Sequence, residues 1–230
     1  MDAEALVEAD PINPMRLFHE LSSRLPDNVI VTADSGSSAN WYARHLRFRG
    51  DMHGSLSGNL ATMGSGVPYG IGAKFGNPDS PVVVFAGDGA MQMNGLAELI
   101  TIKYYWREWA DPRLVIAVLH NDDLNQVTWE MRAMEGAPKF AESQTLPSID
   151  YAGFAASLGR QAIAVDRPGD IGPAWERALA ADRPTLLDVR CDPNVPPIPP
   201  HATLDQVKDA GRAILKGDQD RRGEGTPGPG

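Results

Sequence analysis

Two short polar motifs follow apolar segments and contain the residues best suited to chemistry. A Gly-Asp-Gly triplet centred on Asp88 follows the apolar run 81–86, and Asn121 follows the apolar run 114–119. A carboxylate and an amide oxygen are hard ligands of the kind that Mg²⁺ prefers in proteins. The glycines leave backbone N–H groups open to phosphate oxygens. These residue types predict a magnesium ion that holds a diphosphate.

Each half of this pattern also has a simpler interpretation. A Gly-Asp-Gly triplet alone is most often a turn, and so is the Asn-Asp pair that begins at Asn121. The two together, each ending an apolar segment, are far more specific for a ligand site. Because no lysine or arginine flanks Asp88 in the sequence, a metal ion would have to neutralise a diphosphate bound there.

Alternating strands and helices must position these motifs. The two apolar runs are typical of strands that are buried on both faces of a sheet. Further strands are expected at 29–33, 161–165 and 185–189. The glycine-rich segment 54–76 is expected to turn from a loop into a helix. The expected helices are 13–25, one through Trp41 and Leu46, one through Ile71 and Phe75, one capped by Asn94 that runs to Tyr104, and 171–180. This alternation predicts an α/β fold, a doubly wound parallel sheet with helices on both faces. In such sheets ligands bind at the carboxyl ends of the strands, where both motifs lie.

Composition excludes several classes of function. The chain has 230 residues, of which 42% are hydrophobic, and a formal net charge of −9. An acidic protein is a poor candidate for binding nucleic acid or an anionic membrane surface. The single cysteine, Cys191, rules out an intrachain disulfide and favours a reducing, cytoplasmic location. No apolar run approaches the roughly 20 residues that span a bilayer.

The character of the sequence changes along the chain and predicts four parts. They are a flexible N-terminus (1–12), one α/β domain (13–200), a C-terminal helix (201–216) and a disordered tail (217–230).

The two motifs also support a resemblance to a known family. The pattern Gly87-Asp88-Gly89, Glu98-Leu99 and Asn121 resembles the thiamine diphosphate motif of the pyruvate oxidase, acetolactate synthase and pyruvate decarboxylase superfamily. The resemblance runs from about residue 14 to residue 200 and matches the C-terminal, diphosphate-binding (PP) domain of those enzymes. It is closest to the pyruvate oxidase and pyruvate dehydrogenase (quinone) branch, on the segments 34–36, 61–64, 127–132 and 192–197.

This resemblance implies a cofactor, thiamine diphosphate, and its Mg²⁺ ion. The implied magnesium ligands are Asp88, Asn121 and the backbone carbonyl of Asp123. The implied diphosphate contacts are Gly87, Gly89 and Ala90 on one side and Gly36, Ser37 and Ser38 on the other.

The resemblance also assigns the loop before the third helix. Met63 would be the apolar wedge that bends thiamine so that its two rings approach each other. The backbone carbonyl of Ala61 would accept a hydrogen bond from the aminopyrimidine. From the residues alone, Met63 is more simply an ordinary core methionine.

The implied activity is decarboxylation or oxidation of a small 2-oxo acid, as in pyruvate oxidase. In that superfamily a glutamate on a separate PYR domain activates the cofactor, and FAD, where present, binds a further domain; this chain matches neither domain. We therefore expect a PYR-bearing partner chain or region in a homo- or hetero-oligomer. The alternatives are a non-catalytic or regulatory thiamine diphosphate-binding module, or one half of an acetolactate synthase-like carboligase.

Three further positions remain ambiguous. Asn121 lies 33 residues after Asp88, which is longer than the usual motif, and the excess is expected in a surface insertion at 106–113. His120 replaces the first of two common asparagines and is either structural or a proton shuttle. Glu130 is either catalytic or a solvated or interface carboxylate.

An unpartnered cofactor face should also expose apolar residues. We expect this patch to favour association and to comprise Trp41, Tyr42, Met63 and Trp129.

Overall fold

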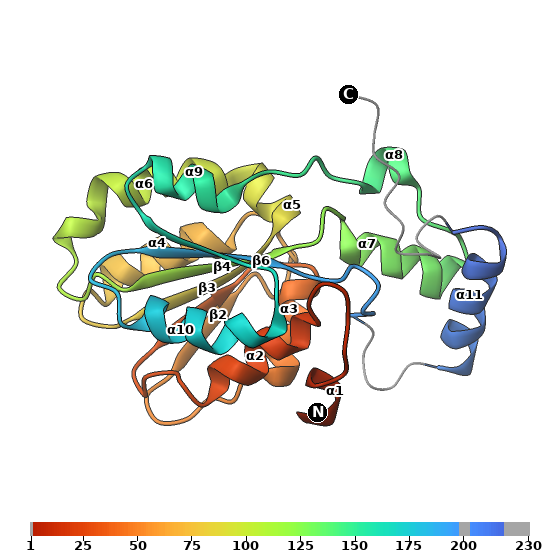
Figure 1. Cartoon of the computed structure of the whole chain (residues 1–230), viewed down its shortest axis with the longest axis horizontal. Coiled ribbons are helices and arrows are strands. Elements are labelled where there is room, and N and C mark those ends of the chain that lie inside the picture. Colours follow the sequence, from red (N-terminus) through yellow and green to blue (C-terminus); the bar gives the residue numbers. More distant parts are fainter. Residues whose placement is uncertain (1, 198–202, 219–230) are drawn as a thin grey trace.

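Six parallel strands form a single sheet in the order β2-β1-β3-β4-β6-β5. The computed structural model describes residues 2–197 and 203–218. Helices cover both faces of the sheet (Figure 1), so the predicted doubly wound α/β fold is confirmed. The strands are β1 (Ile30–Ala33), β2 (His53–Leu56), β3 (Val82–Gly87), β4 (Leu114–His120), β5 (Gln161–Val165) and β6 (Thr185–Arg190).

The two faces of the sheet carry two separate hydrophobic clusters, because successive strand residues point in opposite directions. On β3, Val83 and Phe85 point to one cluster, and Val82 and Val84 point to the other. The first is covered by α2 (Pro14–Ser22), α3 (Ser37–His45) and α10 (Ile171–Leu179). The second is covered by α4 (Gly66–Gly76), α6 (Leu96–Tyr105) and α9 (Tyr151–Ser157).

The helix after β3 begins earlier than the sequence suggested. We predicted Asn94 as an N-cap, but the chain turns helical at Asp88 and continues through α5 (Asp88–Ala90), a π-helical turn η1 (Met91–Gly95) and α6. Asn94 therefore lies inside the π-helical turn. The correction matters because it places Asp88 in the first turn of a helix, directly at the end of a strand.

Strand β2 was missed altogether. We expected the glycine-rich segment 54–76 to begin as a loop, because His53–Leu56 contains no apolar run. In the structure this strand is largely exposed. Its backbone pairs in parallel with β1, where Ile30 is opposite His53. An edge strand of this kind is held by backbone hydrogen bonds to one neighbour, which sequence patterning does not reveal.

The N-terminal segment, expected to be flexible, packs on the domain. It forms α1 (Asp2–Ala5), and Ala5 and Ile12 are fully buried. The Asn13 side chain donates hydrogen bonds to the carbonyl oxygens of Glu4 and Val7, at 3.0 and 3.1 Å, and also accepts one from Met15 at the start of α2.

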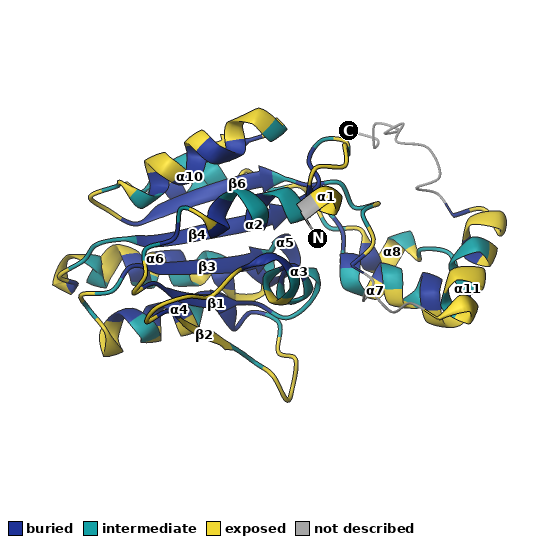
Figure 2. Cartoon of the chain, turned by 90° about the horizontal axis from the view of Figure 1, so that it is seen from below, coloured by how far each residue is buried: buried dark blue, intermediate teal, exposed yellow. Residues whose placement is uncertain are grey.

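The C-terminal helix α11 (Leu204–Leu215) lies beyond the carboxyl edge of the sheet (Figures 1 and 2). It packs against η3 (Met131–Glu135), which continues α7 (Asn125–Glu130); α8 (Ala141–Gln144) follows η3 along the chain. After it, Asp218 is buried in an ion pair with Arg132 at 2.7 Å, although we had assigned residue 218 to the disordered tail. Residues 219–230 of that tail lie outside the described part of the chain. Two 3-10 turns, η2 (Trp106–Glu108) and η4 (Pro168–Asp170), complete the elements.

Within the described residues, no helix has both the length and the apolar character needed to cross a membrane.

Candidate cofactor site at the carboxyl ends of the strands

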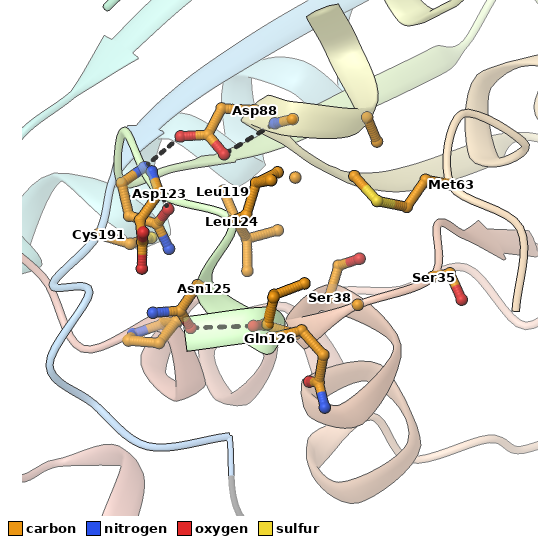
Figure 3. A pocket seen from close by; sticks show the side chains of 18 of the residues that line it. Ser35, Ser38, Met63, Asp88, Leu119, Asp123, Leu124, Asn125, Gln126 and Cys191 are labelled. Carbon is orange, nitrogen blue, oxygen red and sulfur yellow. Dashed lines mark hydrogen bonds between the residues drawn. The ribbon is translucent and has the colours of Figure 1, made fainter. Parts of the chain in front are cut away.

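A cavity opens at the point where the strand order reverses. β1 lies between β2 and β3, so the connections that follow β1 and β3 leave the sheet in opposite directions and open a crevice between them. Figure 3 shows Asp88, Met63 and Ser38 around this cavity. Its lining includes most of the predicted site residues, namely Gly36, Ser37, Ser38, Met63, Gly87, Asp88, Gly89, Ala90, Asn121 and Asp123.

Asp88 is held almost entirely by backbone N–H groups. Its Oδ2 accepts hydrogen bonds from Asn121 N and Asp122 N, at 2.8 and 2.6 Å, and its Oδ1 accepts one from Gly89 N at 2.9 Å. Burial raises the pKa of Asp88 to about 6, against the opposing effect of these donors. A carboxylate has about four lone-pair sites, so Oδ1 keeps one for a further ligand.

Asn121 offers a second oxygen at the same cavity. Its Oδ1 accepts a hydrogen bond from Asp123 N at 3.1 Å, which leaves one of its two lone pairs. The Asp123 side chain points elsewhere, since it contacts Thr128 Oγ1 at 3.0 Å and Lys139 Nζ at 3.1 Å. No lysine flanks Asp88 in the sequence, but the fold brings Lys139 close to the second motif. The role of the Asp123 carbonyl as a third ligand stays a prediction.

His120 is enclosed by polar partners. It is 3% exposed, its Nδ1 lies 2.7 Å from Asp188 Oδ1, and its Nε2 lies 2.8 Å from Asp122 Oδ1. Burial alone would lower the pKa of His120, but the two hydrogen-bonded carboxylates outweigh it and raise the pKa to about 9. Because both ring nitrogens are engaged, the structural interpretation of His120 is the better supported one.

The loop that contains Met63 is anchored by a residue that sequence reasoning did not single out. Asp34, at the end of β1, is 1% exposed and accepts hydrogen bonds from the backbone N–H groups of Gly64, Ser65 and Gly66, at 2.7, 3.1 and 3.2 Å. Burial raises the pKa of Asp34 despite these donors. The loop thereby brings Met63 Cε to within 3.2 Å of where a Cβ on Gly89 would lie.

The residues predicted for the second side of the diphosphate site, Gly36, Ser37 and Ser38, also line the cavity. Gly36 has a positive φ of 98°, a conformation that favours glycine. Ser37 Oγ donates to Asn125 Oδ1 across the cavity at 2.9 Å, and Ser38 Oγ donates to the Asp34 carbonyl at 3.0 Å. Ala61 is an exception among the predicted site residues, because it is exposed and does not line the cavity. The hydrogen bond expected to its carbonyl stays a prediction.

Several lining residues were missed. Asn125 and Gln126 begin α7 and face the cavity, and Cys191 follows β6. Asn125 Nδ2 donates to the Pro193 carbonyl at 2.7 Å. The short sequence separation from Asn121 could have indicated Asn125 and Gln126, because a helix that starts directly after a strand-end ligand presents its first turn to the same site.

One of the four residues predicted to form an exposed apolar patch is buried. Trp41 is 1% exposed, because it lies on the inner side of α3 and packs into the hydrophobic cluster that contains Phe85. Met63, Tyr42 and Trp129 are half-buried, and the Trp129 indole donates to the Pro193 carbonyl.

Two other ambiguous features lie away from the cavity. Glu130 is exposed and accepts a hydrogen bond from Gln126 at 2.8 Å, and it does not line the cavity. The predicted insertion at 106–113 leads into the amino end of β4, the edge opposite the site. It is not wholly a surface feature, since Trp109 is buried and packs edge-on against Phe75.

The sheet, its crevice and the paired Asp88 and Asn121 define a class of α/β domain that binds its ligand at the carboxyl ends of parallel strands. Residues 34–189 match the family described as thiamine pyrophosphate enzyme, C-terminal TPP binding domain. The chain therefore belongs to this family.

Similar curated proteins are consistent with this membership. The chain is 28% identical over 206 residues to the putative thiamine pyrophosphate-containing protein YdaP of Bacillus subtilis, covering 90% of this chain and 34% of that protein. It is 32% identical over 207 residues to a probable acetolactate synthase large subunit of Methanococcus aeolicus, covering 87% and 33%. It is 28% identical over 200 residues to a sulfoacetaldehyde acetyltransferase of Castellaniella defragrans, covering 83% and 31%.

The chain thus spans about a third of the length of these relatives. None of the three is named as a pyruvate oxidase, so the expected closeness to that branch has no specific support.

Proposed function

We propose that this chain is the thiamine diphosphate- and Mg²⁺-binding part of an enzyme that decarboxylates a 2-oxo acid. The observation that carries the proposal is the convergence of Asp88 and Asn121 on the switch-point crevice, each with one oxygen lone pair left unused. The open space above Gly87, where a Cβ would meet nothing within 4 Å, suits a diphosphate that approaches the backbone closely.

In this proposal the residues of the chain bind and orient. Asp88 Oδ1 and Asn121 Oδ1 hold Mg²⁺, and the N-terminal turn of the helix that begins at Asp88 faces the phosphates. Met63 supports the organic part of the cofactor from the side of Gly89. Thiamine diphosphate, when bound, supplies the electron sink for cleaving the bond beside a carbonyl group.

The later fate of the substrate is a separate part of the proposal. The named acetolactate synthases favour transfer to a second 2-oxo acid, whereas the motif resemblance favoured oxidation as in pyruvate oxidase. Either outcome needs the activating glutamate of a PYR domain, for which the one-third coverage of the relatives leaves room.

Binding tests the first part of the proposal. Calorimetry should show thiamine diphosphate binding to the chain that depends on Mg²⁺ and is lost in Asp88→Ala. Asp79→Ala, which removes an exposed carboxylate, is the matched control and should bind normally. Unchanged affinity in Asp88→Ala would show that the site is assigned wrongly.

Turnover tests the second part. The chain is mixed or coexpressed with a PYR-bearing chain, and consumption of pyruvate is followed together with its products. Acetolactate would support carboligation, and acetate formed with an electron acceptor would support oxidation. Inactivity with every such partner, in a chain that binds the cofactor, would favour the non-catalytic module instead.

A further inference from the structure

The residue between the two halves of the second motif has an unusual backbone. Asp122 has a positive φ of 55°, and it is one of only two non-glycine residues with a positive φ in the described part of the chain. This left-handed conformation costs a non-glycine residue free energy, although aspartate tolerates it better than most. It persists where surrounding contacts hold it, so the contacts of Asp122 are informative.

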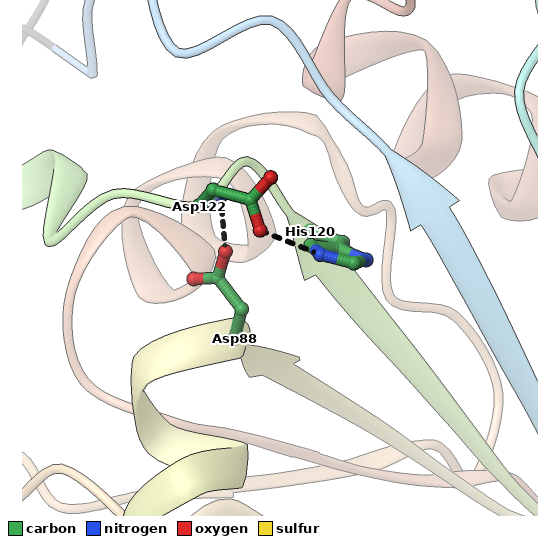
Figure 4. A group of neighbouring side chains, drawn as sticks. All are labelled: Asp88, His120 and Asp122. Atoms are coloured by element: carbon green, nitrogen blue, oxygen red, sulfur yellow. Dashed lines mark hydrogen bonds and ion pairs between the residues drawn. The ribbon is translucent and has the colours of Figure 1, made fainter. Parts of the chain in front are cut away.

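Side chains from two strands contact the two oxygens of Asp122, and they also contact each other, since Arg190 Nη1 lies 2.6 Å from His120 Nε2. His120 Nε2 lies 2.8 Å from Oδ1, and Arg190 Nη2 donates to Oδ2 at 3.0 Å. Figure 4 shows Asp122 between His120 and Asp88. The other ring nitrogen of His120 is also held in place, because Nδ1 lies 2.7 Å from Asp188 Oδ1.

The register of the central strands creates this arrangement. β4 and β6 are parallel neighbours in which Val118 lies opposite Asp188 and His120 lies opposite Arg190. Asp188 and Arg190 are two positions apart and share one face of the sheet with His120. The four polar side chains therefore come from two rigid strands and the turn that follows one of them.

The conformation of Asp122 has a direct effect on Asp88. The turn at Asp122 directs two successive N–H groups, those of Asn121 and Asp122, to the same Asp88 oxygen, at 2.8 and 2.6 Å. Those two bonds orient the carboxylate so that its other oxygen faces the cavity. We propose that Arg190, with His120 and Asp188, is a positioning residue that clamps Asp122 and thereby orients Asp88 for Mg²⁺.

This inference rests on the proposed function, and a double-mutant cycle tests it. The variants are Arg190→Gln, Asp122→Gly and the pair together, and the measurement is calorimetric binding of thiamine diphosphate at saturating Mg²⁺. Arg190 does not line the cavity and its side chain is 40% exposed, so its replacement should leave the fold intact. Melting of the chain without ligand checks this.

Arg190→Gln should weaken binding about tenfold, the usual scale for residues that orient a metal ligand. Glycine adopts a positive φ without strain and has no carboxylate to clamp. In the Asp122→Gly background, Arg190→Gln should therefore change affinity by less than about twofold. Arg190→Lys, which retains a donor, should recover most of the affinity. Arg183→Gln removes an exposed arginine that pairs with its neighbour Asp182 and does not line the cavity, and this variant should bind like the wild type.

Two outcomes would overturn the clamp while leaving the proposed function intact. Wild-type affinity in Arg190→Gln would show that the clamp does not orient the site. An equal loss in both backgrounds would show that Arg190 acts by a route other than Asp122, such as its contact with His120. Absence of Mg²⁺-dependent binding in the wild-type chain would instead overturn the proposed function, and this inference with it.

Discussion

Asp88→Asn should stabilise the chain without cofactor while removing its magnesium site. Asp88 is 2% exposed, and its pKa is raised by burial from 3.8 to about 6. Each pKa unit corresponds to about 1.4 kcal/mol, so the ionised carboxylate costs the fold about 3 kcal/mol at neutral pH. Asparagine avoids that cost but turns an N–H₂ group toward Gly89 N, which loses a hydrogen bond worth about 1 kcal/mol. The net gain at pH 7.5 is about 2 kcal/mol.

The sign of the pH dependence follows from the direction of the shift. A carboxyl whose pKa is raised on folding contributes stability below its unfolded pKa and loses that contribution as pH rises through its folded pKa. The advantage of Asp88→Asn should therefore shrink by about 1.4 kcal/mol between pH 7.5 and pH 5. Urea unfolding of both proteins at several pH values measures the difference directly, with Asp79→Asn as the exposed control.

The ligand provides the second readout. Mg²⁺ with thiamine diphosphate should raise the apparent stability of the wild-type chain, because a ligand that binds only the folded state stabilises it, and should leave Asp88→Asn unchanged. An asparagine variant that is no more stable at pH 7.5, or a difference that does not vary with pH, would refute the buried-charge argument. Wild-type ligand stabilisation in the variant would refute Asp88 as a magnesium ligand.

Three other perturbations have defined outcomes. A Cβ on Gly89 would lie 2.8 Å from a methyl carbon of Leu124, whereas a Cβ on Gly87 would meet nothing within 4 Å. Gly89→Ala should therefore lower the melting temperature of the unliganded chain, and Gly87→Ala should not. Equal melting temperatures of the two variants would contradict this. Burial lowers the pKa of Lys74 to about 8. Between pH 8 and pH 10 the free energy of unfolding of the wild type, measured in urea, should therefore rise by about 2 kcal/mol more than that of Lys74→Met. Free energies of unfolding that change equally with pH in both proteins would show that the pKa of Lys74 is not lowered. Asp34→Asn should speed backbone hydrogen exchange at residues 61–66 and spare the strands, because its amide cannot accept all three N–H bonds; unchanged exchange would mean that the Met63 loop is held by other contacts.

Central strands and their ligand-bearing ends were predictable because both are local features. β3 and β4 are continuous apolar runs, and the proposed ligands Asp88 and Asn121 follow directly where those runs stop. Strand β2 was not predictable in the same way, because the exposed segment His53–Leu56 gains its strand character from pairing with β1.

The residues that support the site were harder to find than those that line it. Arg190 lies 68 residues from Asp122, and only the β4–β6 register brings them together. Asp34 lies about 30 residues from the glycine-rich loop it anchors. Arg190 belongs to no periodic pattern or short motif. Asp34 lies in the segment 34–36 that supports the family resemblance, but that segment does not indicate which backbone groups the Asp34 side chain contacts.

Three buried carboxylates lie at or near the carboxyl ends of the strands, where the proposed cofactor would bind. Asp34, Asp88 and Asp188 are all at least nine-tenths buried. Asp34 directly follows β1, Asp88 directly follows β3, and Asp188 lies near the end of β6. Each orders a turn or a side chain rather than filling the core, and at Asp88 the arrangement is unfavourable to the unliganded fold at neutral pH. Selection for stability alone would favour neutral residues at Asp88, because burying a charge costs free energy. A buried carboxylate at this position is what the proposed Mg²⁺ site requires, because a bound cation would offset the cost of the charge.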